Sequence, residues 1–420
     1  LFSYRGENYV PEEYRHEEFD GLKLHVDGAM HYKESKLHAI DLALDQFEAK
    51  MQVHPVRFED FSGRFHYEDE HLTIEAMHGK IGRSVFDLDM NYYLGTDESI
   101  KLRDNHLGLR AEYIDFDQLI AFNPPPPGTS KVRSSQKLTT EDVEAHSNAF
   151  NLYTLPFTDM TFDLDVDHFI YHTLDLQDIH STLRMTHDHY IYVDTMRMRA
   201  AGGEFFLSGY FNGSDPERIY FKPNLKVVNA DVDQLLLKYE NFGQDEVLSD
   251  YVHGQLSATI TGTIRMYPDM VPDIDQSEIH MDVELLNGSL ENYEPVLMLS
   301  DYMGDKNLSR VQFDTLKNHM DITNGTITIP NMTIESTLGH YELSGEQSLA
   351  GKLEYYIRIP WKIIKQGVRY KLFGNKETTG GEAGNDEIIE KDPTKNTRYL
   401  NLMVKGTLDD YDIQLRKKKK

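Results

Sequence analysis

A seven-residue pattern with glycine at both ends occurs twice in the chain. It reads Gly-Glu-Phe-Phe-Leu-Ser-Gly at 203–209 and Gly-His-Tyr-Glu-Leu-Ser-Gly at 339–345, 136 residues later. A more divergent copy, Ser-Val-Phe-Asp-Leu-Asp-Met, occupies 84–90. In all three copies one alternate set of residues is mostly apolar and the other mostly polar, which is typical of a half-buried β-strand. The chain is therefore predicted to repeat one β-unit.

The same alternation runs through most of the chain, most regularly from 252 to 266. A shared Asp-x-Asp-Gln-Leu sequence follows an apolar segment at 115–119 and again at 231–235. We interpret each as a strand leading into a short helix, with Asp115 and Asp231 as N-caps in preference to catalytic residues. The prediction is a mainly β protein with short helices at 115–121, 231–240, 295–304 and 361–373.

Two polar stretches interrupt this pattern. The first opens with four consecutive prolines, Pro124 to Pro127, and the second contains several glycines. Both are predicted to be linkers or disordered insertions, because they lack apolar periodicity. The expected organisation is β-unit one at 1–123, a Pro-rich polar insertion at 124–150, β-unit two at 151–270, a C-terminal β-unit with helices at 271–373, a disordered insertion at 374–398, and a final strand with a basic tail at 399–420.

Composition restricts the possible functions. The net charge of −27, from 43 Lys and Arg against 70 Asp and Glu, argues against a nucleic-acid partner, which requires a basic surface. The chain has no cysteine, which excludes disulfides, thiolate metal ligands and a cysteine nucleophile within it. The chain begins with Leu1, and we expect an N-terminal anchor or signal segment to precede it.

The third β-unit carries a resemblance to a known family. Its features are the Asn324-Gly325 turn, the strand at 339–345 and a closing Val-Lys-Gly-Thr-Leu-Asp-Asp at 404–410. Residues from about 255 to 415 resemble the C-terminal region of AsmA-like envelope proteins, and the two earlier units resemble the family's repeated β-groove more loosely. The resemblance implies an elongated, curved antiparallel β-sheet groove with an apolar lining, in a periplasmic protein anchored to the inner membrane by a helix that is missing from this chain.

The resemblance also implies a function. A protein of this family is expected to bind or conduct phospholipid between inner and outer membranes and to support outer-membrane biogenesis, without being an enzyme and without a cofactor. Its expected partners are phospholipid, a membrane surface at the ends of the groove and envelope proteins whose identity is open. The expected lining residues are Phe86, Leu88, Phe205, Leu207, Ile260, Ile264, Tyr341, Leu343 and Ile357. The expected membrane-contact helix carries Trp361, Lys362, Lys365 and Lys371.

The residues themselves leave several alternatives. Glycines on the apolar face permit the curvature of a groove, and they equally suit ordinary β-bulges. His187 and His189 share a strand face, and His168, His172 or His180 could complete a metal site, but a solvated polar face is the commoner home for such histidines and we predict no metal site. Asp163, Asp165 and Asp167 are likewise assigned to a solvated face in preference to glycosidase carboxylates.

The alternative function is a β-helix or β-sandwich protein that binds or hydrolyses carbohydrate. A β-helix repeats every roughly 20–25 residues, whereas the similarity here returns after 116 to 136 residues. No Gly-x-Ser-x-Gly, phosphate-loop or dinucleotide motif occurs in the sequence.

Overall fold

The computed structural model describes most of the chain. The described residues are 19–34, 36–51, 56–95, 97, 99, 105–119, 157–171, 174–238, 250–268, 270–292, 294–297, 308–349, 351–360, 388, 390–391, 397–407 and 410–415. The predicted insertion at 124–150, the predicted helix at 361–373 with all four membrane-contact residues, and most of the predicted insertion at 374–398 lie outside these ranges.

Within these ranges, nineteen strands form one sheet that does not close. The first nine are β1 (Phe19–Lys33), β2 (Lys36–Met51), β3 (Arg57–Glu68), β4 (His71–Ile81), β5 (Ser84–Tyr93), β6 (His106–Asp115), β7 (Met160–Tyr171), β8 (Leu174–Met185) and β9 (Tyr190–Ala200). The others are β10 (Gly203–Asn212), β11 (Tyr220–Asp231), β12 (Val252–Met266), β13 (Pro272–Glu291), β14 (Arg310–Thr323), β15 (Thr326–Ser336), β16 (Gly339–Ser348), β17 (Lys352–Pro360), β18 (Tyr399–Thr407) and β19 (Tyr411–Leu415).

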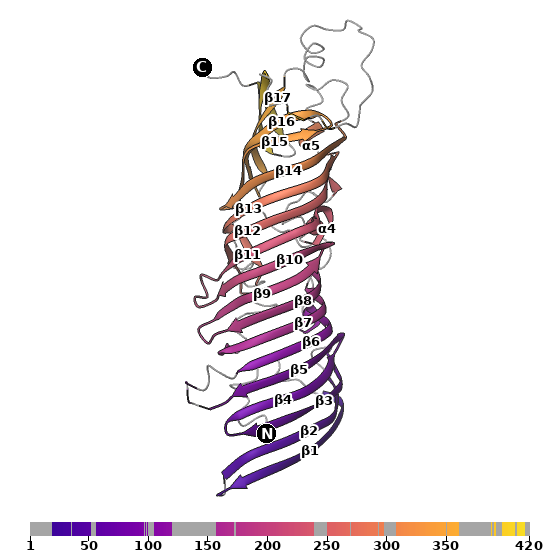
Figure 1. Ribbon diagram of the computed structural model, residues 1–420, viewed down its shortest axis with the longest axis vertical. Coiled ribbons are helices and arrows are strands. Elements are labelled where there is room, and N and C mark those ends of the chain that lie inside the picture. The colour runs from indigo at the N-terminus through magenta and orange to yellow at the C-terminus, as the bar shows by residue number, and fades with distance from the viewer. Residues whose placement is uncertain are drawn as a thin grey trace.

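The strands pair in the order of the sequence. Each strand hydrogen-bonds the next, and the pairing is antiparallel at every step except between β6 and β7, which are parallel. Figure 1 shows the result, a long, curved stack of strands with β1 near one end and the C-terminal strands at the other. The predicted elongated, curved β-sheet groove is confirmed as a fold class. The described strands form neither two packed sheets nor the coils of a β-helix.

The three sequence repeats are equivalent hairpins. The copies at Ser84, Gly203 and Gly339 each begin a ten-residue strand, namely β5, β10 and β16. Each is preceded by an eleven-residue strand, namely β4, β9 and β15. The sheet continues without a break across the expected unit boundaries, because β6 pairs with β7 and β12 pairs with β13.

Short helices follow two equivalent strands. Helix α2 (Phe116–Leu119) follows β6 and α4 (Val232–Lys238) follows β11, close to the predicted ranges. The backbone N–H of Gln118 donates to Asp115 Oδ1 at 3.0 Å, which confirms Asp115 as an N-cap. Helix α5 (Glu294–Leu297) begins one residue before the predicted 295–304, whose last residues lie outside the described ranges. None of the described helices is long and apolar enough to cross a membrane.

Candidate functional site

One face of the sheet carries apolar side chains that line up across many strands. Ten residues from β5 to β14 lie directly opposite one another in successive pairs, and we call them the central stripe. They are Leu88, Leu109, Leu164, Ser181, Met196, Leu207, Leu225, Ile260, Met281 and Met320. With strands about 4.8 Å apart, the stripe is roughly 40 Å long.

The central stripe remains partly open while its margin is closed. Near helix α4, Phe205, Val227 and Ala258 are buried and pack with Leu235 of the helix. The stripe members on the same three strands lie two residues away from these buried side chains and are only half-buried. They are Leu207, Leu225 and Ile260. The helix therefore covers one edge of the apolar face and leaves the middle of that face partly exposed.

The nine lining residues expected from the sequence occupy two different environments. Leu88, Leu207 and Ile260 belong to the central stripe, and Phe86, Phe205 and Ile264 pair with apolar residues of the same face. The other three lie at the C-terminal end. Ile357 is part of a buried cluster there, and Tyr341 and Leu343 pack against it.

Burial raises the pKa of the Tyr341 hydroxyl far above its usual range. At this end the face is a closed core. Sequence reasoning missed the other apolar members of the stripe, because strand register decides which alternating residues become neighbours. They are Leu109, Leu164, Met196, Leu225, Met281 and Met320.

Four glycines on the apolar face allow adjacent strands to approach closely. Gly209, Gly262, Gly345 and Gly406 have φ values of 146°, 151°, 154° and 148°. A Cβ at any of them would lie 2.1–2.2 Å from a main-chain carbonyl oxygen, which belongs to the next strand for the first three and to Asp410, just before β19, for Gly406. Gly209 and Gly262 also lie at or beside register shifts, and such bulges increase local twist. The sequence allowed these glycines to serve either groove curvature or ordinary β-bulges. The two interpretations describe one feature, because the bulges contribute to the curvature.

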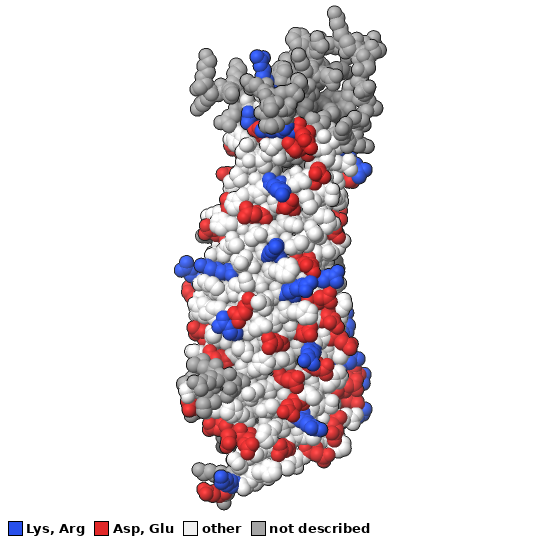
Figure 2. Space-filling view, viewed as in Figure 1, with Lys and Arg blue, Asp and Glu red and all other residues white. Residues whose placement is uncertain are grey.

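The opposite face of the sheet is polar and is crossed by ion pairs. Arg184 pairs with Asp194 at 2.6 Å, and Lys317 of β14 pairs with Glu284 of β13 at 2.8 Å. Figure 2 shows acidic and basic side chains interspersed from end to end of the face in view. These exposed pairs keep that face hydrated and contribute little to stability individually.

The histidines that the sequence suggested as metal ligands have separate partners. His187 Nδ1 lies 2.9 Å from an Asp159 carboxylate oxygen, while the His189 ring packs against Phe157 with centroids 4.6 Å apart. His180 Nδ1 lies 3.0 Å from Asp165 Oδ1, and His172 falls outside the described residues. Among the described members of this set, His168, His180, His187 and His189, the structure assembles no group around one point.

A histidine–carboxylate pair on the polar face predicts a pH-dependent contribution to stability. The hydrogen bond between His66 Nδ1 and Asp41 Oδ1, 2.7 Å long, raises the pKa of His66 and lowers the pKa of Asp41. Because the pKa of His66 is raised in the folded protein, its contribution to stability is fully present below about pH 6.5 and is lost as the pH rises through the folded pKa. Because the pKa of Asp41 is lowered, its contribution is present above about pH 4 and is lost as the pH falls through the folded pKa.

We therefore expect Asp41→Asn to lower the urea midpoint most at about pH 5.5 and least at about pH 8.5. Unfolding of both proteins in urea at the two pH values measures the difference. An equal loss at both pH values would contradict the assigned pair.

Comparison with known proteins found no relative of this chain. No protein-family model, no curated protein and no solved structure matches the chain.

Proposed function

We propose that the apolar face binds the acyl chains of phospholipid and that the protein is a non-enzymatic lipid conduit. The observation that carries this proposal is the partly exposed central stripe. A soluble protein covers an apolar surface of this extent with a partner, a ligand or a membrane. A row of Leu, Ile and Met without charge suits acyl chains, because each methylene removed from water contributes about 0.8 kcal/mol.

The one polar residue of the stripe, Ser181, is compatible with binding of acyl chains because its hydroxyl is already paired. Ser181 is buried, and its hydroxyl donates to the Thr195 carbonyl oxygen at 3.0 Å. The backbone groups on either side are paired in the sheet. The stripe thus presents flexible apolar side chains, and methionines such as Met196 and Met281 can adapt to tails of different shape.

The dimensions of the stripe favour conduction over storage of a single molecule. Its roughly 40 Å length exceeds the hydrocarbon thickness of a whole bilayer, about 30 Å. A tail can lie along several strands while its charged headgroup stays in water at the open side. A lipid moving along the stripe would exchange one apolar neighbour for another, with no charged side chain of the stripe to pass.

The AsmA-like resemblance supports the finer part of the proposal. On this basis the cargo is phospholipid, the compartment is the periplasm, and the direction of the groove is between the inner and outer membranes. Membership of that family, anchoring by a preceding helix and contact of Trp361 and its neighbouring lysines with a membrane belong to this proposal.

Site-specific photo-crosslinking tests the proposal. A photo-reactive amino acid at Leu207 or Ile260, on the stripe, is expected to capture phospholipid from the expression host or from added vesicles. The same group at Ser208 or Thr261, the next residues and therefore on the polar face, provides the matched control. Mass spectrometry of the adducts identifies the lipid class.

Two results would contradict the proposal. One is equal lipid capture at the leucine and serine positions. The other is a crosslink from Leu207 only to the protein's own chain, which would mean that a segment of the chain covers the stripe. Leu207→Glu should remain folded and lose capture at Ile260, because a carboxylate loses several kcal/mol of hydration when an acyl chain covers it.

A further inference from the structure

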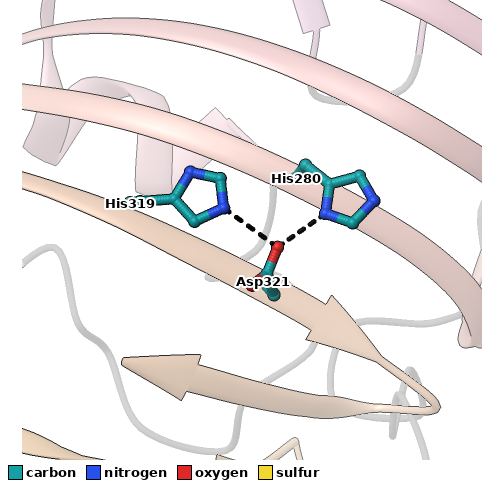
Figure 3. Close-up of side chains that lie close together, drawn as sticks. All are labelled: His280, His319 and Asp321. Atoms are coloured by element: carbon teal, nitrogen blue, oxygen red, sulfur yellow. Dashed lines mark hydrogen bonds and ion pairs between the residues drawn. The ribbon is translucent and has the colours of Figure 1, made fainter. Parts of the chain in front are cut away.

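A group of two histidines and three carboxylates lies on the polar face between β13 and β14. His280 is directly opposite Asp321, and the next outward-facing pair along the strands is Asp282 opposite His319. Histidine and aspartate therefore alternate at the corners of a square. Figure 3 shows both rings turned toward Asp321.

Both imidazoles meet a single oxygen atom. Asp321 Oδ1 lies 2.6 Å from His280 Nδ1 and 3.2 Å from His319 Nε2. The three ligand atoms all lie within 4.8 Å of one another. Ligand atoms of a tetrahedral zinc ion are about 3.4 Å apart, which follows from Zn–N and Zn–O distances of about 2.1 Å. Only small side-chain rotations would be needed to accommodate an ion here.

The remaining ring nitrogens also have carboxylate partners. His319 Nδ1 lies 2.9 Å from Asp282 Oδ1, and His280 Nε2 lies 3.6 Å from Glu278 Oε1. A carboxylate hydrogen-bonded to the far nitrogen is the arrangement that orients metal-bound histidines in zinc sites. Asp282 provides it for His319 and directs the other nitrogen of that ring toward Asp321, whereas Glu278 lies only at ion-pair distance from His280.

From this geometry we propose that His280 Nδ1, His319 Nε2 and Asp321 Oδ1 bind a divalent transition metal ion, with zinc as the best match. Imidazole and carboxylate ligands suit zinc, and water would complete a tetrahedral site. The side chains are 45%, 47% and 37% exposed, so a hydrated ion can reach them. The ion would replace the hydrogen that each ring nitrogen shares with Oδ1 and would link β13 to β14. This differs from the sequence-based expectation of no metal site.

A second histidine–aspartate trio on the same face provides a control. His31 Nε2 and His66 Nδ1 also contact one aspartate, Asp41, but they bind different oxygens, Oδ2 and Oδ1, at 3.1 Å and 2.7 Å. The two rings come from β1 and β3, the strands on either side of the β2 strand that carries Asp41. Asp41→Asn should therefore leave metal binding at the proposed site unchanged.

Zinc competition with a chromogenic chelator tests the proposal on the full chain, stripped of metal beforehand. We expect one tight zinc site per chain, an affinity at least 100-fold weaker in His319→Gln and in Asp321→Asn, and unchanged affinity in Asp41→Asn. Asp282→Asn should weaken zinc about 10- to 100-fold, because it removes the group that orients His319. Cobalt should give the intense visible absorption of a tetrahedral site in the wild type and not in Asp321→Asn.

A thermal readout checks that the variants are folded and reports binding independently. Zinc should raise the unfolding temperature of the wild type and of Asp41→Asn, and leave that of Asp321→Asn unchanged. The proposal is overturned if the wild type binds no zinc in the competition assay, or if Asp321→Asn and His319→Gln retain wild-type affinity. Equal weakening by Asp41→Asn and Asp321→Asn would overturn it as well.

Discussion

Gly345→Val is expected to lower the free energy of unfolding by about 4 kcal/mol, from about 1–3 kcal/mol of backbone strain and a similar cost of overpacking. The φ of Gly345 is 154°, which side chains rarely adopt. A Cβ would lie 2.2 Å from the Glu354 carbonyl oxygen and 2.8 Å from Tyr355 Cα. Both atoms are backbone of β17, so the neighbouring strand would have to move away and the C-terminal cluster would loosen.

Denaturant unfolding followed by far-ultraviolet circular dichroism measures the effect. Gly108→Val is the matched control within a strand, because the nearest atoms to its added Cβ are 3.9 Å and 4.0 Å away and its φ is ordinary. The control should change stability by less than about 1 kcal/mol, as valine suits a strand. Similar destabilisation by both substitutions would show that close strand approach does not explain the glycine at 345.

Asp115→Ala is expected to cost about 1–2 kcal/mol, mainly from the lost N-cap. Asp115 is 1% exposed and accepts hydrogen bonds from the Gln118 backbone and the Arg83 guanidinium. It therefore joins helix α2 to the turn between β4 and β5, where Gln118 Oε1 also accepts from the Arg83 backbone N–H at 2.7 Å.

The Asp115→Asn variant separates the contribution of the N-cap hydrogen bond from that of the carboxylate charge. Asp115→Asn keeps an oxygen that can accept from Gln118, and we expect it to lose less than half as much stability as the alanine variant. The Arg83 side chain is 66% exposed, so water can replace much of its interaction with Asp115. Equal denaturation midpoints for wild type and Asp115→Ala would contradict the assignment of this residue as a structural cap.

Local patterns account for much of the secondary structure. The alternation at 84–90, 203–209 and 339–345 predicts strands, and all three are strands that begin at the predicted residue. Asp115 in front of Phe-Asp-Gln-Leu predicts a helix start, and the helix begins at Phe116. These features depend on neighbours within a few residues, on side-chain period and on capping, all of which can be seen in a sequence.

The candidate sites required the tertiary structure. Period 2 places Leu207 and Leu225 on a face, but it does not make Leu225 the neighbour of Ile260, since a shift of one residue in register moves every side chain to the other face. The parallel pairing of β6 with β7 likewise depends on how the chain crosses between two distant segments.

The amino-acid sequence by itself determined that this protein is built from repeated, alternating strands with short capped helices. Only the tertiary structure decided that the strands pair in sequence order as one open sheet, and that apolar residues line up across its strands from β5 to β14. It also brought His280 to Asp321 and His319 across the β13–β14 pair. The physical reason is that alternation and capping are local, whereas register, burial by α4 and convergence of side chains depend on contacts between residues far apart in the chain.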